Sequence, residues 1–235
     1  FENVSKKQFN TFLPSYWIIK STGGFLILYK QITIYDLLEI LSKKLGPQNW
    51  WPAENTEDML SGMILIQNTN WKNADRSLAN LKQATNFETD RILALSTDEM
   101  EQLIQPSGFF HNKAIYLRSM LTAYRDNFDD WSKLSTPLLR KKLIAMKGVG
   151  NETADVLLLY YFHRPTFVAD NYSMKLFTKL HTFTTKPTYI QLKTAVERDF
   201  KLESKQAEEL HALIDEFGKL KSDYFDDYQL KLPYL

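Results

Sequence analysis

The chain has 235 residues, 44% of them hydrophobic, which is enough for one large domain or two small ones around an apolar core. It contains no cysteine, which excludes disulfides, cysteine-type zinc sites, a thiol nucleophile and a cysteine-held iron–sulfur cluster. The formal net charge of +1 does not by itself support a nucleic-acid partner. Between Gln105 and Leu180, however, 11 Lys and Arg stand against 6 Asp and Glu, so positive charge is concentrated in the middle of the chain.

The first 30 residues contain the stretch most similar to a membrane segment, Tyr16–Tyr29. Lys20 and the segment Ser21–Gly24 interrupt it, whereas about 20 consecutive apolar residues are needed to cross a bilayer. We therefore expect a soluble, cytoplasmic protein that does not enter a membrane. The apolar runs Trp17–Ile19 and Phe25–Tyr29, on either side of a Gly-Gly turn, predict a β-hairpin extension within residues 1–30.

From Thr33 onward the sequence predicts a succession of helices. Thr33 and Asp36 have the spacing of a capping box at the start of an amphipathic helix. Asn55 or Thr56 can cap a second helix, whose stretch Met59–Ile66 is apolar on all sides, as is typical of a helix buried between others. Further helical patterns cover residues 71–84, 97–104, 112–124, 137–146, 152–162, 172–180, 188–200 and 204–221. Since no other strand is predicted after the hairpin, the fold class is all-α.

A turn between two of these helices has the composition of an anion site. Leu143–Leu159 reads L-I-A-M-K-G-V-G-N-E-T-A-D-V-L-L-L, and two glycines around one apolar residue let the backbone reverse sharply and expose successive N–H groups. Together with the N-terminus of the next helix, these groups suit a phosphate. The alternative is an ordinary helix–helix corner in which the glycines only supply positive φ. Val149, expected to be buried and to pin the turn, favours the anion site, and so does a basic run beside it: Arg140, Lys141, Lys142 and Lys147.

Twenty residues after Gly150 comes a second motif, V-A-D-N-Y-S at Val168–Ser173, preceded by Pro165. The hairpin, the apolar helix and this Pro and V-x-D together resemble the signature of the endonuclease III superfamily of helix-hairpin-helix DNA glycosylases. I-Q-N-T at Ile66–Thr69 extends the resemblance upstream, and it covers about residues 35–220. It implies two helical domains with a cleft between them: a discontinuous domain of residues 31–54 and 164–235, and a helical barrel of residues 55–163 that contains the hairpin.

The resemblance also implies roles for individual residues. Asp170 corresponds to the catalytic carboxylate, which stabilises positive charge on the sugar as the N-glycosidic bond breaks and orients or deprotonates the attacking water. Gln67 corresponds to the wedge that fills the space left by an extruded nucleotide. The alternatives are that Asp170 only caps the helix beginning near Tyr172, and that Gln67 is merely a polar helix-end residue. The phosphate-binding residues of the family correspond to Lys147, Gly148, Val149, Gly150, Asn151 and Thr153.

The sequence departs from the family in two places. Members with lyase activity have a Lys two residues after the second hairpin glycine, and this chain has Glu152 there. A carboxylate cannot form the imine that strand cleavage requires, so we expect a monofunctional hydrolase that leaves an abasic site. Many members also carry a four-cysteine iron–sulfur loop, which a chain without cysteine cannot form. We therefore expect no iron–sulfur cluster and no other cofactor.

Three tryptophans indicate which base is removed. Trp50 and Trp51, in W-W-P, and Trp71 lie on either side of the helix that precedes Gln67. Aromatic faces attract cationic rings, and an N3- or N7-alkylated purine is a cation whereas normal purines are neutral. With P-S-G-F-F at Pro106–Phe110, these residues resemble the bacterial 3-methyladenine DNA glycosylase subgroup, which implies an aromatic pocket for alkylated purines. The alternative is that these tryptophans only pack in the core or at a domain interface.

The remaining ionisable residues suggest no further site. The four histidines do not pair at ligand spacing, so no metal site is expected. Lys113 and Arg118 are expected either to contact phosphate or to lie on a solvated face. We therefore expect a monomeric glycosylase that binds double-stranded DNA, extrudes an alkylated purine such as 3-methyladenine and hydrolyses its bond to the sugar. Two rivals are a glycosylase for a mismatched or oxidised base and a non-catalytic helix-hairpin-helix DNA-binding protein.

Overall fold

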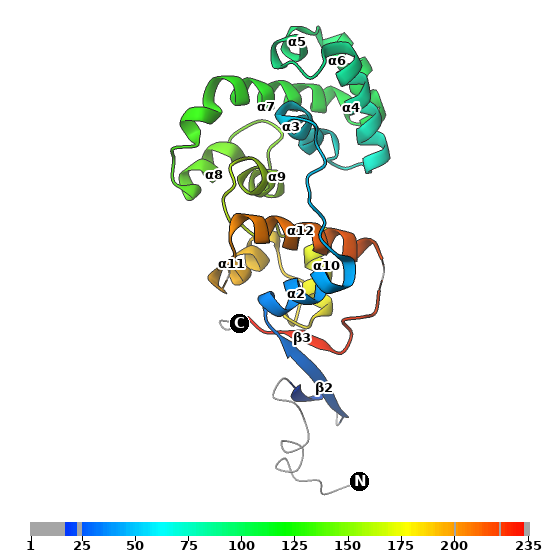
Figure 1. Cartoon of the computed structure of the whole chain (residues 1–235), viewed down its shortest axis with the longest axis vertical. Helices are drawn as coiled ribbons and strands as arrows, with labels where there is room; N and C mark the ends of the chain where they lie inside the picture. Colours follow the sequence, from blue (N-terminus) through cyan, green and yellow to red (C-terminus); the bar gives the residue numbers. More distant parts are fainter. Residues whose placement is uncertain (1–16, 23–24, 200, 221, 233–235) are drawn as a thin grey trace, which may run out of the picture. The chain divides into compact units, whose positions relative to one another are not determined.

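The computed structural model describes residues 17–22, 25–199, 201–220 and 222–232. The chain divides into two compact units, one from within residues 1–48 and 167–235 and the other from residues 49–166 (Figure 1). We refer to them as the discontinuous unit and the contiguous unit. In both, helices predominate, which confirms the predicted all-α class.

The discontinuous unit combines helices with a small sheet. Its helices are α2 (Ile34–Leu45), α10 (Asn171–Lys179), α11 (Tyr189–Asp199) and α12 (Ser204–Lys219). Its strands are β1 (Trp17–Thr22), β2 (Phe25–Ile32) and β3 (Tyr228–Leu230). β1 and β2 pair antiparallel, whereas β3 joins the other edge of β2 in parallel, with Ile32 opposite Leu230.

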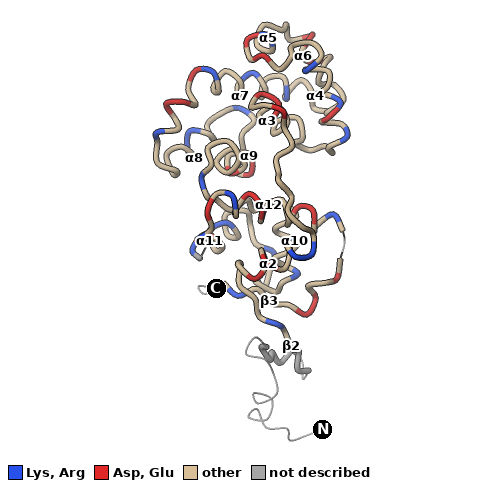
Figure 2. The backbone as a smooth tube through the Cα atoms, in the orientation of Figure 1, with Lys and Arg blue, Asp and Glu red and all other residues tan. Residues whose placement is uncertain are grey.

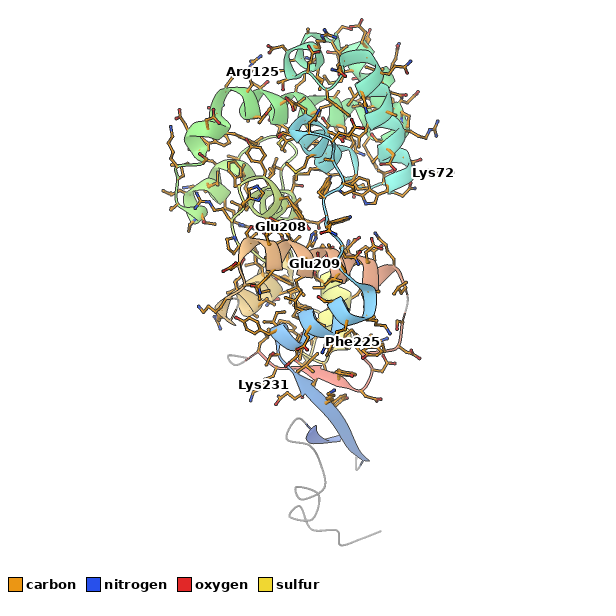
Figure 3. The ribbon with its side chains drawn as sticks, in the orientation of Figure 1. Lys72, Arg125, Glu208, Glu209, Phe225 and Lys231 are labelled. Carbon is orange, nitrogen blue, oxygen red and sulfur yellow. The ribbon has the colours of Figure 1, made fainter. Side chains whose placement is uncertain are left out.

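Apolar faces of these helices meet in the core of the discontinuous unit. The capping box predicted at Thr33 and Asp36 is present and starts α2, which buries its apolar side. Phe225, labelled in Figure 3, follows α12 and is fully buried. It packs edge-on against Phe217, at 5.0 Å between ring centroids. Other buried members of this core are Leu37, Leu41, Leu176, Phe177, Leu192, Val196, Leu210 and Leu213.

The contiguous unit is a helical bundle in which α7, with 22 residues, is the longest of the described helices. Its elements are α3 (Thr56–Leu65), α4 (Trp71–Thr85), α5 (Thr89–Ala94), α6 (Thr97–Ile104), a 3-10 turn (Gln105–Ser107), α7 (Phe110–Trp131), α8 (Thr136–Ile144), α9 (Asn151–Val156) and a π-helical segment (Leu157–Tyr161). Asn55 is the residue that caps α3, through a hydrogen bond from the backbone of Asp58. As predicted for a helix between others, α3 is buried along most of its length.

The structure differs from the predicted elements in four places. The helix predicted over residues 112–124 is longer, because Phe128 continues the buried side of α7 past a run of Asp and Asn. The helix predicted over 152–162 changes from α to π at Leu157, and α5 was not predicted.

The prediction that no strand follows the hairpin was wrong. β3 has three residues, and its partner β2 lies far away in the sequence, so no local sequence pattern predicts this strand. The predicted hairpin strands are present, while the Gly-Gly turn lies outside the described residues.

Local contacts explain where the chain passes from one unit to the other. The backbone N–H of Gln48 donates to Glu209 on α12, within the discontinuous unit. Trp50 and Trp51 instead pack on rings of the contiguous unit, so residues 49–54 belong there and not with residues 31–48 as the predicted division had it. On the return, the guanidinium of Arg164 donates to the carbonyl of Ser132 in the contiguous unit.

Candidate functional site

The hairpin between α8 and α9 depends on one of its two glycines more than on the other. Gly148 has φ +82°, and a Cβ atom there would overlap the ring of Tyr116. Gly150 has φ −90° and open space around it, and it precedes α9 without a side chain that could cap the helix. Val149 is buried between them, as predicted. The turn therefore requires glycine at 148 for its conformation, whereas glycine at 150 leaves the start of α9 uncovered.

An ion pair ties the two helices of the hairpin together. Arg140 on α8 donates Nε–H and Nη2–H to the two carboxylate oxygens of Asp155 on α9, at 2.8 and 2.9 Å. Its Nη2 also donates to Oδ1 of Asn151 at 2.9 Å. Asp155 is fully buried, so Arg140 is committed to neutralising it. The exposed cations of the predicted basic run are therefore Lys141, Lys142 and Lys147.

Gln67 bonds directly to the hairpin. It follows α3, and its side-chain amide nitrogen donates to the backbone carbonyl of Gly148 at 3.0 Å and to the hydroxyl of Thr153 at 3.2 Å. The side chain is half-buried. The structure thus joins two motifs that lie about 80 residues apart in the sequence, and it places Gln67 at the surface of the contiguous unit beside the hairpin.

Lys113 and Arg118, both on α7, bond to backbone carbonyls within the contiguous unit. Lys113 is 2% exposed, and its Nζ donates to the carbonyls of Leu65 at 2.8 Å and Ser107 at 2.7 Å. Burial lowers the pKa of Lys113 to about 8. Arg118 donates to the carbonyls of Leu93, at 2.8 Å, and Leu95. The expectation that these two cations lie on a solvated face or contact phosphate was wrong, because carbonyls at the ends of neighbouring helices and turns hold them.

The three tryptophans of the predicted base pocket gather in one cluster with a fourth ring. Trp51 lies at centroid distances of 5.3 Å from Trp50 and 5.4 Å from Trp71. Tyr160, from the π-helical segment, adds an edge at 6.2 Å from Trp50 and 5.7 Å from Trp51. The tryptophans are half-buried, so parts of the rings are accessible to a ligand while other parts pack on one another.

Asp170, in the discontinuous unit, caps a helix, which is one of the two roles predicted for it. Its Oδ1 accepts a hydrogen bond from the backbone N–H of Ser173 at 2.7 Å and so starts α10. Its Oδ2 lies 3.9 Å from Nε2 of His211 on α12. Both residues are buried, each 8% exposed. Burial lowers the pKa of His211, against the opposing effect of Asp170 and Asp215, and so favours the neutral imidazole.

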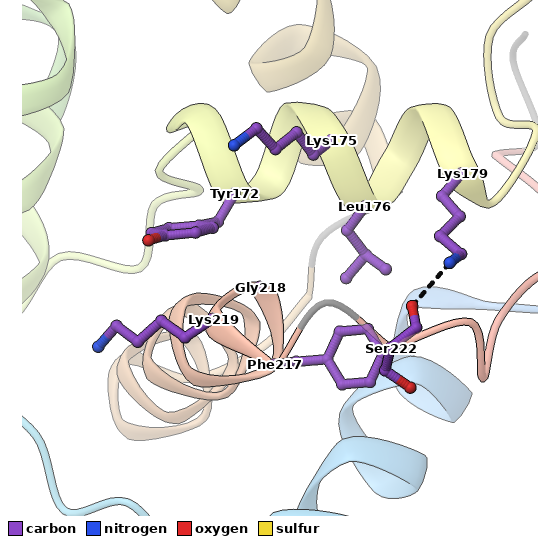
Figure 4. Close-up of a pocket in the computed structure, with 8 residues that line it drawn as sticks. All are labelled: Tyr172, Lys175, Leu176, Lys179, Phe217, Gly218, Lys219 and Ser222. Carbon is purple, nitrogen blue, oxygen red and sulfur yellow. Dashed lines mark hydrogen bonds between the residues drawn. The ribbon is translucent and has the colours of Figure 1, made fainter.

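A groove of about 560 Å³ lies between α10 and α12, and its lining on α10 begins at Tyr172, two residues after Asp170 (Figure 4). Tyr172 lies over Gly218, where a side chain would overlap its ring. Two of the three lysines along the groove are in ion pairs, Lys179 with Asp226 and Lys219 with Asp215, each at 2.6 Å. Figure 2 shows that acidic and basic residues are interspersed along the backbone of both units.

Sequence reasoning missed several residues that complete these arrangements. Tyr160 was predicted only to be part of an apolar helix, but its ring packs on Trp50 and Trp51. The pairing of Arg140 with Asp155 had a signal, since Asp155 directly precedes the apolar run Val156–Leu159 and a buried carboxylate requires a partner. His211 had none, because its burial follows from tertiary packing of α12 on α10.

Among the described residues, no group of three or more His, Cys, Asp and Glu side chains is placed to hold a metal ion. Within the same residues, every helix is too short or too polar to span a bilayer.

Comparisons with known proteins agree with this arrangement of motifs. Residues 61–201 match the family described as HhH-GPD superfamily base excision DNA repair protein. A Methanocaldococcus jannaschii protein named as a DNA repair glycosylase is 37% identical over 191 residues, which cover 79% of this chain and 87% of that protein. Endonuclease III of Sulfolobus acidocaldarius is 27% identical, over 66% of this chain and 69% of that one.

Solved structures show the same fold. The crystal structure of Helicobacter pylori 3-methyladenine DNA glycosylase bound to 1,N6-ethenoadenine aligns with a TM-score of 0.67 and 25% identity, over 81% of this chain and 99% of that one. An endonuclease III trapped as a covalent intermediate on DNA aligns with a TM-score of 0.64 and 17% identity, over 80% and 85% of the two chains. Together with the hairpin and the family match, these similarities show that the chain belongs to the HhH-GPD superfamily of base excision DNA repair proteins and is a DNA glycosylase.

Proposed function

We propose that this glycosylase removes a cationic alkylated purine, such as 3-methyladenine, from double-stranded DNA by hydrolysis. The observation that carries the proposal is the cluster of Trp50, Trp51 and Trp71 with Tyr160. Ring faces attract cations, by about 0.5–2 kcal/mol per contact, and an N3- or N7-alkylated purine is positively charged. The 25% identical Helicobacter pylori structure, named as a 3-methyladenine glycosylase, supports the same class of substrate.

In this proposal Asp170 acts on the sugar and on the water. The hydrogen bond from Ser173 fixes the orientation of its carboxylate before DNA binds, so little reorganisation is needed as charge develops. As the bond from C1′ to the base breaks, the cationic purine takes the bonding electrons and leaves neutral, and positive charge develops on the sugar. Asp170 stabilises that charge and accepts a proton from the water whose oxygen bonds to C1′. The product is an abasic site.

The contiguous unit contributes DNA binding in the same proposal. The hairpin residues Lys147, Gly148, Val149, Gly150, Asn151 and Thr153 bind a phosphate, chiefly through backbone N–H groups. Gln67, already bonded to Gly148 and Thr153, fills the space that the extruded nucleotide leaves. We propose a monomer that works without a cofactor and without an iron–sulfur cluster, since the chain has no cysteine to hold one.

We also propose that the enzyme lacks lyase activity. Glu152, exposed on the first turn of α9, occupies the position of the family's imine-forming lysine, and a carboxylate cannot form an imine. Buried Lys113, whose Nζ is held by two carbonyls, is not placed to replace it. Borohydride treatment during turnover should trap no covalent adduct between protein and DNA. A trapped adduct would remove this part of the proposal and leave the base specificity intact.

The substrate class is tested by incubating the protein with duplexes that contain a methylated purine, adenine opposite 8-oxoguanine, or uracil. We expect release of the methylated purine. Trp50→Leu should lower that release roughly 2- to 30-fold, the equivalent of one cation–ring contact. Trp131→Leu is the matched control, because Trp131 packs on Phe128 outside the cluster. Release of only adenine or uracil would favour the mismatch or oxidised-base rival, and binding without any release would favour the non-catalytic one.

A further inference from the structure

Lys113 occupies a position that connects two loops of the contiguous unit. It lies in the first turn of α7, and its Nζ donates to the carbonyl of Leu65, the last residue of α3, and to that of Ser107, the last residue of the 3-10 turn. Carbonyls at the end of a helix lack intrahelical donors and carry partial negative charge. One ammonium group therefore satisfies both helix ends at once.

Each of the two loops presents a side chain two residues further on. After Leu65 comes Gln67, which is bonded to the hairpin. After Ser107 comes Phe109, which has a left-handed backbone (φ +48°) and a side chain 67% exposed. An exposed aromatic side chain on a strained backbone next to a buried, charged anchor is an unusual use of a phenylalanine. The anchor keeps both loops in fixed register with α7.

We propose that Lys113 is a positioning residue that holds the Gln67 and Phe109 loops for extrusion of the target nucleotide, and that it takes no part in the chemical step. This inference rests on the proposed role of Gln67. The chain of contacts runs from Lys113 to the end of α3, then through two residues to Gln67 and from there to Gly148 of the hairpin. Without Lys113, the segment Ile66–Asn70 loses the contact that holds its N-terminal end to α7.

Extrusion can be separated from chemistry by changing what the lesion pairs with. Extrusion costs less when the lesion has no base opposite it. The rate constant of excision is measured in single turnover on a normal duplex and on one with an abasic site opposite the lesion. For Lys113→Met we expect a loss of about tenfold or more on the normal duplex, consistent with two lost hydrogen bonds from a charged group, and a markedly smaller loss on the unpaired lesion.

Arg118→Met is the matched control. Arg118 also holds two backbone carbonyls from α7, those of Leu93 and Leu95, but these belong to the end of α5 and not to a loop that carries Gln67 or Phe109. Its loss of activity should be the same on both duplexes. Lys113→Arg, which keeps a charged donor, should recover part of the activity on the normal duplex. If Lys113→Met does not fold at the assay temperature, Lys113→Gln takes its place under the same criterion.

The outcomes distinguish this inference from the proposed function. Equal losses for Lys113→Met on the two duplexes, at a temperature where circular dichroism shows the variant folded, would overturn the inference and leave the glycosylase assignment untouched. If the wild-type protein excises no alkylated purine, the substrate proposal fails. Extrusion is then followed by the fluorescence of 2-aminopurine placed beside an unpaired nucleotide in bound DNA. A signal equal in wild type and Lys113→Met would overturn the inference there too.

Discussion

Asp170 and Ser173 form the hydrogen bond that begins helix α10, with Oδ1 of the carboxylate accepting from the backbone N–H at 2.7 Å. The bond ties the orientation of one carboxylate to the start of one helix. The other oxygen, Oδ2, lies 3.9 Å from Nε2 of His211 and is oriented by the same bond. A structural role and a proposed catalytic role therefore reside in different oxygens of the same side chain.

Two substitutions of Asp170 should separate these roles. Asn caps a helix about as well as Asp, so Asp170→Asn should unfold at nearly the wild-type temperature while the rate constant of excision falls by about 10²-fold or more. Asp170→Ala should lose the same activity and also about 1 kcal/mol of unfolding free energy. Urea unfolding and single-turnover excision measure the two effects. Undiminished excision by Asp170→Asn would exclude Asp170 from the reaction.

The buried ion pair between Arg140 and Asp155 predicts that substitutions of the two residues have non-additive effects on the free energy of unfolding. Arg140→Met leaves a fully buried carboxylate without its bidentate partner and should destabilise the protein by about 3–5 kcal/mol. Arg140→Met combined with Asp155→Leu removes both charges and should recover most of that loss. Arg125→Met, which breaks exposed ion pairs with Asp90 and Asp126, is the control and should change the melting temperature little. If the double variant were no more stable than Arg140→Met, the buried charge would not be the cause.

The two hairpin glycines should differ in their tolerance of alanine. At Gly148 a methyl group faces both a positive φ and the ring of Tyr116, so Gly148→Ala should cost about 2–5 kcal/mol. At Gly150, with φ −90° and open space, Gly150→Ala should cost about 1 kcal/mol or less. Thermal unfolding of the two variants at one pH measures the difference. Equal effects would mean that the turn does not depend on its left-handed residue.

The lowered pKa of Lys113 predicts how stability changes in alkali. Burial lowers the pKa from 10.5 to about 8 in the folded protein, so between pH 8 and 10.5 the unfolded state binds more protons than the folded state at this residue. The free energy of unfolding of the wild type, relative to Lys113→Met, should therefore rise with pH across this window and be constant below pH 8. Urea unfolding of both proteins from pH 7 to 10.5 tests it. A difference that falls with pH would mean that Lys113 is stabilised in its charged form.

Local signals in the sequence were sufficient for most helices and for the motifs of the candidate site. The capping box at Thr33, the cap at Asn55 and the buried Val149 all depend on neighbours within a few residues, and each is present. The contacts that sequence reasoning missed or misjudged are long-range. Lys113 looked like a surface cation because nothing near it in the sequence shows that the end of α3, 48 residues earlier, requires a donor. The contact of Tyr160 with Trp50 and Trp51 was missed for the same reason, because these residues lie far apart in the sequence.

The parallel pairing of β2 with β3 has a consequence for the order in which the chain folds as it is synthesised. Strand β2 and helix α2 leave the ribosome before the contiguous unit, but strand β3, the parallel partner of β2, and helix α12, which packs on α2, follow residue 166. At about 5–20 residues per second, those early segments wait roughly 6–24 seconds while the contiguous unit is made and can complete its own core. The apolar side of α2 lacks its partners from the discontinuous unit for that time, so it is exposed to association with other apolar surfaces until residues 167–235 are made.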